Sequence, residues 1–335
     1  MKKLIYPVLS LALLFSSLVS GAQDEKTKER KKFEFVKEKN ISKTYPAAGN
    51  QLDIENSFGN VKVIPWDKNE IKVDIHIEAS ANEQALVQKI FDAISVNDRQ
   101  QGNKVEFETK IDNKKGRIDN CKNCKSTMSI DYEVRLPVTV ALEIENSFGS
   151  IILPDYKGAV SLTSKFGDLT TGNLANVKKM GVEFGSAKVK SVSDLDASFK
   201  FSKIDIDNLS GKSKINLEFC DATSINLGNQ LSSLTLNESY SSVNIKPGGL
   251  EASYKVATSF GSFVDRTSTG VKRTDTPDKY GPDSNRTFEG GSGAVRIDIK
   301  SSFGNIILGE PTADDLKNRK EKSKNKHKSK AAVHI

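Results

Sequence analysis

The sequence predicts an all-β protein, a parallel β-solenoid with coils of about 18–20 residues and one helix near its N-terminal end. A short aromatic motif, best seen as "SFG", recurs between Phe148 and Phe260 at steps of 18, 18, 17, 18, 21 and 20 residues. The residues on either side of it alternate between apolar and polar, as half-buried strands do. A unit this short cannot bury its own core, so neighbouring copies must stack and share one.

The first 22 residues read as a signal peptide. Two lysines precede an apolar run from Leu4 to Val19, and Ser20 and Ala22 are the small residues that a signal peptidase requires. We expect cleavage after Ala22; the alternative is an uncleaved anchor, for which the apolar run is short. With no cysteine at the cleavage point, we do not expect a lipid anchor, and no later stretch predicts a membrane-spanning helix. The expected location is therefore the periplasm, the outer cell surface or the medium.

The N-terminal part is more elaborate than the rest. Residues 23–40 are highly charged and predict a flexible leader. The stretches 70–78, 104–111 and 129–136 alternate strictly and predict strands. Between the first two, Ser80 and Glu83 form a capping-box pattern before apolar residues at helical spacing. These signals predict one helix at about 81–95 that covers the sheet or the end of the stack.

The recurring aromatic residues are expected to form a ladder, one ring above the next at the strand spacing of roughly 4.8 Å. We expect this ladder to line the buried interior, the alternative being a surface on which a ligand stacks. Its members are Phe58, Phe148, Phe166, Phe184, Phe201, Phe219, Tyr240, Phe260 and Phe303. A glycine follows six of the rings and is expected to provide positive φ at a tight corner. These corner glycines are Gly59, Gly149, Gly167, Gly185, Gly261 and Gly304.

The predicted organisation follows from these patterns. Trp66 is expected to cover an apolar edge at a turn, and the segment rich in Thr, Asp, Gly and Pro after Phe260 predicts an irregular loop. The expected segments are a signal peptide (1–22), a leader (23–40), the solenoid (41–310) and a disordered basic tail (311–335). Within the solenoid they are elaborated coils (41–145), regular coils (146–264), a loop insertion (265–293) and the last coil (294–310).

The net charge of +7 is concentrated at the two ends of the chain. The two N-terminal lysines and the tail account for all of it, so the body carries no net charge, which argues against nucleic acid as a partner. The tail could contact an anionic surface, or it could serve only to keep the chain soluble. The candidate contacts are Lys320, Lys322, Lys324, Lys326, Lys328 and Lys330.

Three cysteines are present. Cys121 and Cys124 lie in "CKNC" and form a candidate disulfide in an oxidising compartment. Reduced thiols, or metal or redox chemistry, are the alternatives, although a structural zinc site would need two further ligands. Cys220 stands alone in an apolar strand and is expected to be a small buried residue.

Two stretches of this chain resemble sequences of the bacterial putative-adhesin β-strand-repeat proteins, which include the head GIN domains of Bacteroidetes envelopes. They are "NSFGNVKVIPWDKNEIKV" near the start and "FEGGSGAVRIDIKSSFGNIIL" near the end, and the likeness covers most of 45–310. The resemblance implies a β-helical fold, right-handed, and a place in the envelope or at the surface. It implies no functional residues and no cofactor.

These observations predict a non-enzymatic exported envelope protein, an adhesin-like scaffold that binds a polymer or a protein. One alternative is a carbohydrate-active enzyme, which needs a suitably spaced carboxylate pair. Pairs such as Asp205 and Asp207 arise by chance on such faces, and His76 is the only histidine of the body. Another alternative is a periplasmic interaction module in envelope-stress signalling. We assign no catalytic, cofactor-binding or metal-binding residue.

Overall fold

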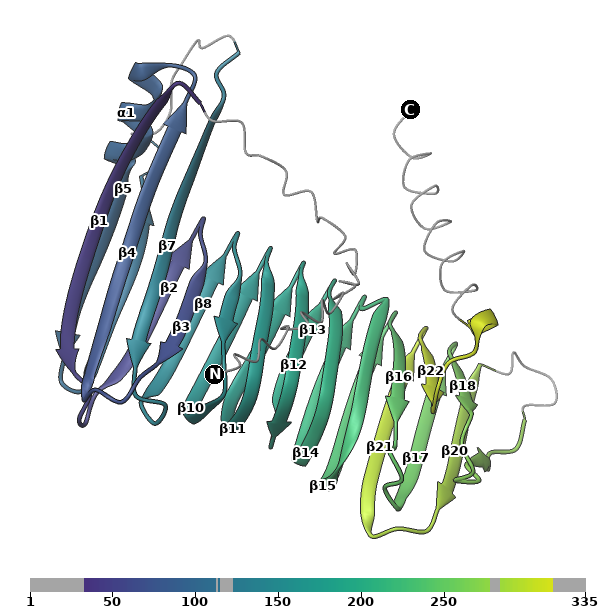
Figure 1. The fold of residues 1–335 in the computed structure, drawn as a ribbon. Coiled ribbons are helices and arrows are strands. Elements are labelled where there is room, and N and C mark those ends of the chain that lie inside the picture. The colour runs from purple at the N-terminus through teal and green to yellow at the C-terminus, as the bar shows by residue number, and fades with distance from the viewer. Residues whose placement is uncertain (1–32, 113, 115–122, 278–283, 316–335) are drawn as a thin grey trace, which may run out of the picture. The chain divides into compact units, whose positions relative to one another are not determined.

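The computed structural model describes residues 33–112, 114, 123–277 and 284–315 (Figure 1). These residues belong to one compact unit, Phe33–Ile335. Its described residues form strands with one helix, α1, and a helical turn at 313–315. The prediction of an all-β protein is confirmed. The expected signal peptide lies outside the described residues. Among the described helices, none combines the length and apolar character needed to cross a bilayer.

The N-terminal strands pair mainly in the antiparallel sense. β4 lies between β1 and β7 and is antiparallel to both, and β5 is antiparallel to β6. The three stretches that alternate in sequence lie within β4, β6 and β7. The bounds are β1 Phe35–Pro46, β2 Gln51–Ser57, β3 Val61–Pro65, β4 Glu70–Ala81, α1 Gln84–Ala93, β5 Ile94–Gln101, β6 Lys104–Ile111 and β7 Ser126–Leu136.

Two expectations for this part were wrong in detail. β1 begins within the stretch expected to be a flexible leader, because its residues form a complete antiparallel ladder with β4. α1 is shorter than predicted: Glu83 is its N-cap without a side-chain cap bond. Ser80 belongs to β4, and its hydroxyl bonds that of Thr127 instead. Ile94 starts β5, since pairing with β6 outweighs the helical spacing.

The central strands pair in parallel, each with its equivalent one repeat along the chain. Lys165 of β10 lies opposite Glu183 of β11, and Lys200 of β13 lies opposite Glu218 of β14. Equivalent positions therefore stay in register through the central repeats. The bounds are β8 Ala141–Ser147, β9 Ile151–Leu153, β10 Tyr156–Lys165, β11 Asp168–Glu183, β12 Ser186–Ser193, β13 Asp196–Lys200, β14 Lys203–Glu218, β15 Ala222–Ser239 and β16 Ser242–Lys246.

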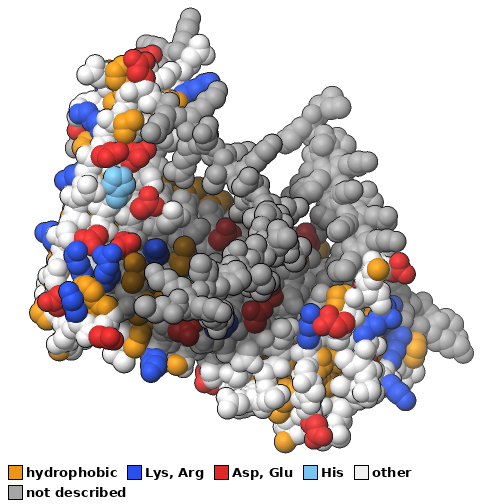
Figure 2. All heavy atoms as spheres, viewed as in Figure 1, with side chains coloured by type: hydrophobic (Ala, Val, Ile, Leu, Met, Phe, Trp, Pro, Cys, Tyr) orange, Lys and Arg blue, Asp and Glu red, His pale blue; other side chains and the backbone are white. Residues whose placement is uncertain are grey.

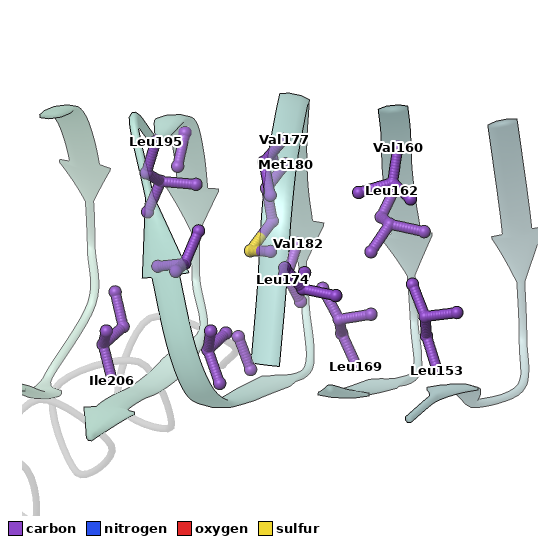
Figure 3. Packing of buried hydrophobic residues seen from close by; sticks show 14 of the residues in the cluster. Leu153, Val160, Leu162, Leu169, Leu174, Val177, Met180, Val182, Leu195 and Ile206 are labelled. Carbon is purple, nitrogen blue, oxygen red and sulfur yellow. The ribbon is translucent and has the colours of Figure 1, made fainter. Parts of the chain in front are cut away.

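Aliphatic side chains fill the interior between these strands. Leu153, Leu162 and Leu169 come from three successive strands and are fully buried in one cluster (Figure 3). That cluster extends without a break from the N-terminal strands to the last repeat. Burial of a leucine side chain contributes about 2 kcal/mol, and each such contact is shared between neighbouring repeats.

The C-terminal end departs from the order of the sequence. β21 pairs in parallel with both β15 and β17, so the final repeat lies between the two repeats that precede it. It is therefore not the last coil in space. β20 is antiparallel to β17, within the expected irregular loop. The bounds are β17 Ala252–Ser259, β18 Ser262–Asp265, β19 Lys272–Arg273, β20 Asn285–Gly291, β21 Val295–Ser302 and β22 Asn305–Leu308.

Antiparallel elements extend the parallel sheet at both ends of the described chain. β1, β4 and β5 extend the sheet at one end, and β20 with β19 does so at the other. α1 packs against β4 through Leu86 and Val87, which form a small cluster with Ala79 and Ala81. An uncovered parallel edge would be a template for pairing with other chains; antiparallel strands cover the edges of β7 and β17, whereas β18 pairs only with β22 among the described strands.

Candidate functional site

The aromatic residue of each repeat is itself the corner. All nine have positive φ, between 50° and 64°, a region that non-glycine residues seldom occupy. Backbone hydrogen bonds hold them there: the N–H of Phe148 donates to the carbonyl of Lys165 at 2.9 Å, and that of Phe166 to Glu183 at 2.8 Å. The corner conformation is thus imposed by the neighbouring repeat.

The corner glycines have a different role from the one expected. None of the six has positive φ, so the prediction that they supply it was wrong. They allow close approach instead. A Cβ at Gly149 would lie 1.9 Å from the carbonyl oxygen of Gly59, and one at Gly167 would lie 1.9 Å from that of Gly149. Successive corners are in contact backbone to backbone, which leaves no room for a side chain.

The nine rings stack in one continuous row. Neighbouring centroids are 4.7–5.1 Å apart and neighbouring planes are within 11° of parallel. We call these nine residues the aromatic row. In space its order is Phe58, Phe148, Phe166, Phe184, Phe201, Phe219, Tyr240, Phe303 and Phe260.

The aromatic row lies on the surface, so the expectation of a buried ladder was wrong. Seven of its rings are 40–60% exposed, and only Val36 and Ile152 join them as exposed large hydrophobic residues in the described chain. The left-handed corner interrupts the strand alternation, and aliphatic residues occupy the interior in place of the rings. An inner ring has both faces covered by its neighbours and presents only its edge. A ligand that must stack on a ring face therefore finds none between the inner rings; the end ring Phe260 has one stacked neighbour and is 60% exposed.

Inside the aromatic row, two residues before each ring, lies a column of buried side chains, six of the nine being polar. Near the N-terminal end, the side-chain amide of Asn56 donates to Asn146 at 3.0 Å, and that of Asn146 donates to the carbonyl of Gly59 at 2.9 Å. Further along, Glu238 is 4% exposed and accepts hydrogen bonds from the Ser301 hydroxyl and from the backbone N–H of Ser241. Burial raises the pKa of Glu238 to about 7, although both hydrogen bonds lower it.

A groove of about 600 Å³ lies where the N-terminal strands meet the repeats. We call it the N-terminal groove. Side chains of both charges gather over this part of the molecule (Figure 2). Its polar lining comes from four strands and the corner before one of them: Asn40 and Ser42 of β1, Asp74 and His76 of β4, Asp131 and Glu133 of β7, Lys62 of β3, and Asn60 just before β3.

The carboxylates of the groove are held by the protein's own donors. Asp74 accepts from the Ser42 hydroxyl at 2.6 Å and from Arg135 at 2.8 Å, and Lys72 lies 3.0 Å away. Burial alone would raise the pKa of Asp74, but these donors hold it below its ordinary value. Asp131 accepts from the backbone N–H of Asn60 at 2.7 Å. The acidic side chains are fixed in place before any ligand arrives.

The orientation of His76 is also fixed. Its Nδ1 lies 2.8 Å from Oδ1 of Asn40; the tautomer with the proton on Nδ1 donates to that amide oxygen and leaves Nε2 as an acceptor. One ligand atom from each of Glu38, His76 and Glu78 lies within 4.8 Å of the others. Among the residues that the structure describes, these three form the group that could hold a metal ion, and the expectation of no metal remains a prediction.

The other described residues that the sequence singled out do not line the groove. Cys121 is outside the described residues, so the candidate disulfide is not described, and Cys124 packs near α1. Cys220 is fully buried and its pKa is raised by burial. Asp205 and Asp207 lie on β14. Trp66 donates from Nε1 to the carbonyl of Glu70 at 2.7 Å, beneath the Lys68 ammonium.

The six candidate tail lysines are outside the described residues, and contact with an anionic surface remains a prediction. Sequence reasoning missed the N-terminal groove. Alternation marked Asp74 and His76 as outward-facing, but concavity arises only from the pairing of β1, β4, β7 and β3, which no local pattern reveals. The exposure of the aromatic row had no local signal either: the residue two positions before each ring is buried, so alternation predicts a buried ring, and only the positive φ of the corner interrupts that alternation.

No family model matches the chain, and no curated protein matches it. Among solved structures it is similar to a putative adhesin from Bacteroides fragilis, with 13% identity and a TM-score of 0.35 over 81% of this chain and 97% of that one. A putative cell adhesion protein from Clostridium sporogenes shows 11% identity and a TM-score of 0.23 over 82% and 100%. A putative lipid binding protein from Parabacteroides distasonis shows 10% and 0.27 over 81% and 97%. The function is therefore inferred from the chain's own residues.

Proposed function

We propose that this chain is a non-enzymatic, exported envelope protein with an adhesin-like role, whose stacked repeats form a β-solenoid. The N-terminal groove is its binding site, and a hydroxyl-rich envelope polymer is its ligand. The in-register parallel pairing of β8 to β16 supports the solenoid. The signal-peptide pattern at residues 1–22 supports export.

The proposal rests on the polar lining of the N-terminal groove, whose side chains are held in place by the protein itself. A sugar hydroxyl both donates and accepts hydrogen bonds, and the groove offers both kinds of partner. Asp131 and Nε2 of His76 are acceptors, and the ammonium of Lys62 is a donor that forms no ion pair within the described part of the chain. Because His76 and Asp131 are already held by Asn40 and Asn60, little side-chain entropy of these two residues is lost on binding.

The electrostatics of the groove favour binding over glycoside cleavage. An enzyme of that class needs a carboxylic acid that stays protonated near neutral pH, which requires a raised pKa. The pKa of Asp74 is instead lowered by Ser42, Lys72 and Arg135. A fixed carboxylate of this kind accepts hydrogen bonds from hydroxyls but is a poor proton donor.

Isothermal titration with a panel of purified bacterial envelope polysaccharides tests the proposal. We expect saturable binding of at least one polymer, and no change in that polymer's chain length after prolonged incubation. The double variant K62A/H76A should weaken binding at least about tenfold, the loss of roughly one to two net hydrogen bonds. The matched control is K188A, an exposed lysine of β12 outside the groove.

Three results would contradict the proposal. Shortening of the polymer would indicate an enzyme, and equal binding by K62A/H76A would place the site elsewhere. Binding of an envelope protein in place of every polysaccharide would overturn the ligand class.

A further inference from the structure

We propose that Glu38, His76 and Glu78 form a binding site for a zinc ion on the outer face of the N-terminal strands. The sequence predicted no metal site, because Glu38 lies far from the other two residues along the chain. The pairing of β1 with β4 brings them together, so that one ligand atom from each lies within 4.8 Å of the others. This site goes beyond the binding function proposed above and does not depend on it.

The register of β1 and β4 builds the site. Glu38 lies directly opposite Glu78, and Asn40 lies directly opposite His76. Residues two apart on a strand point to the same face of a sheet, so these four side chains share one face, on which each is at least partly exposed. Two carboxylates and an imidazole on neighbouring positions are ligand types that bind zinc in proteins.

The two facing glutamates lack the neutralisation that other acidic residues of this face receive. Like charges directly opposite each other on paired strands are destabilising. The side chains of Glu38 and Glu78 form no ion pair or hydrogen bond within the described part of the chain, whereas Asp74 on the same face lies beside Lys72 and Arg135. A bound cation would replace the repulsion between the two glutamates with attraction.

The positions around the two glutamates carry no basic residue on this face of the described strands. Ser129 of β7 lies opposite Glu78. The next positions along β1 and β4 are Val36 and Ser80 in one direction and Asn40 and His76 in the other. The described strands therefore place no lysine or arginine next to the facing carboxylates.

Asn40 prepares His76 to act as a ligand. Its Oδ1 lies 2.8 Å from Nδ1 of His76, and the tautomer protonated on Nδ1 leaves the lone pair of Nε2 for a metal. Metal-binding histidines are held in this way through the nitrogen that does not touch the metal. Asn40 is thus a positioning residue and not a ligand.

Asp131 lies opposite His76 on β7 but is not part of the site. Its Oδ1 accepts a hydrogen bond from the backbone N–H of Asn60 at 2.7 Å, and its Oδ2 accepts one from the Ser129 hydroxyl at 2.5 Å. Movement toward a metal would break these bonds. The site therefore has three protein ligands, which leaves the fourth position of a tetrahedral zinc ion open.

The donor set favours zinc over the hard cations. Calcium takes six to eight oxygen ligands and magnesium requires an octahedron of them, whereas imidazole nitrogen suits zinc. Ligand atoms around a tetrahedral zinc ion are about 3.3 Å apart, closer than the 4.8 Å limit here. Glu38 and Glu78 have no other partner to lose within the described chain, so their side chains can rotate inward when the ion binds.

Isothermal titration of Zn²⁺ into the purified full chain, without polysaccharide, tests the proposal. We expect wild type to bind one equivalent of zinc that is lost or weakened at least about tenfold in H76A and in E38Q/E78Q. Calcium should bind this site at least about a hundredfold more weakly than zinc. N40A should weaken zinc binding about tenfold, and N40D, which keeps an acceptor for Nδ1, should restore it.

The matched control is H327A/H334A, which removes the two histidines of the tail and should keep this equivalent of zinc. Thermal unfolding separates a metal site from a structural role. Without metal, E38Q/E78Q should be at least as stable as wild type, because the repulsion is gone. Zinc should raise the Tm of wild type and of H327A/H334A, and this rise should be absent in E38Q/E78Q and H76A.

Four results would overturn the proposal. They are equal zinc binding by wild type and H76A, full binding by E38Q/E78Q, loss of the equivalent in H327A/H334A, and calcium binding as tight as that of zinc. Glu38 and Glu78 do not line the N-terminal groove, so E38Q/E78Q should bind polysaccharide as wild type does. Failure of the zinc site and failure of the proposed binding function are therefore distinguishable.

Discussion

The central repeats and the N-terminal strands bury the same kinds of side chain but are held together differently. In β8 to β16 each strand pairs in parallel with the equivalent strand of the neighbouring repeat. The same corner, the same ring and the same inward aliphatic positions therefore recur from repeat to repeat. β1, β4 and β7 pair antiparallel and are far apart in the sequence. Ion pairs that do not repeat along the chain, such as Arg135 with Asp74, lie on their outer face.

The difference teaches where each region is vulnerable. In the repeats a backbone contact joins every corner to the next, so a change at one corner disturbs two neighbours. In the N-terminal strands the outer contacts are separate and exposed to water, so one can be lost without affecting the next. Perturbations should therefore be costly in the repeats and mild in the N-terminal strands.

The largest expected effect is at a corner glycine. In G167V the new side chain would begin 1.9 Å from the carbonyl oxygen of Gly149, and only backbone movement could relieve the contact. We expect a loss of more than about 4 kcal/mol in the free energy of unfolding, or failure to fold. Urea unfolding followed by circular dichroism measures it.

The matched control is G102A, in the turn between β5 and β6. Gly102 has φ +61° but nothing within 4 Å of a new Cβ, so only the backbone strain of alanine at positive φ applies, about 1 kcal/mol. Equal losses in the two variants would show that close approach between corners is not what the glycines provide.

The next effect is a pH dependence centred on Glu238. Its folded pKa of about 7 lies above the ordinary value of 4.5, so the folded state binds the proton more tightly than the unfolded chain. The resulting stability is fully present below pH 4.5 and is lost as pH rises through 7. The gap between the two values corresponds to about 3 kcal/mol.

In E238Q the glutamine has nearly the shape of glutamate but does not titrate. Between pH 4.5 and pH 8 the free energy of unfolding of this variant should therefore change by about 3 kcal/mol less than that of wild type. The N-terminal strands should respond in the opposite sense. Tyr45 and Lys43 lower the pKa of Asp98 against the opposing effect of burial, so its contribution is present above the ordinary pKa and is lost as pH falls. Parallel pH profiles of wild type and E238Q would contradict the assignment.

The smallest effect is expected at a surface ion pair of the N-terminal strands. Lys104 lies 2.6 Å from Asp53 and 2.7 Å from Glu106, and the hydrogen bonds to these carboxylates raise its pKa. Because all three side chains are partly exposed, K104M should cost at most about 1 kcal/mol, less at high salt. Urea unfolding at two salt concentrations checks this, and a loss comparable to G167V would remove the contrast between the two regions.

Local patterns predicted much of the secondary structure and little of the site. Alternation located β4, β6 and β7, since each of these strands buries every second residue. The helix was placed too widely because Ile94 suits both a helical face and a strand, and only pairing with β6 decides between them. The N-terminal groove could not be predicted, since Asp74, Asp131 and Asn60 come together only through strand pairing.

By itself the sequence determined that the chain is built of strands and that an aromatic residue recurs once per repeat, because periodicity and alternation are properties of neighbouring residues. Tertiary structure alone decided that the rings face water, that the last repeat lies between two earlier ones, and that a polar groove forms beside His76. The reason is that a ring's exposure depends on the φ imposed by a hydrogen bond from the next repeat, and a groove depends on which distant strands pair.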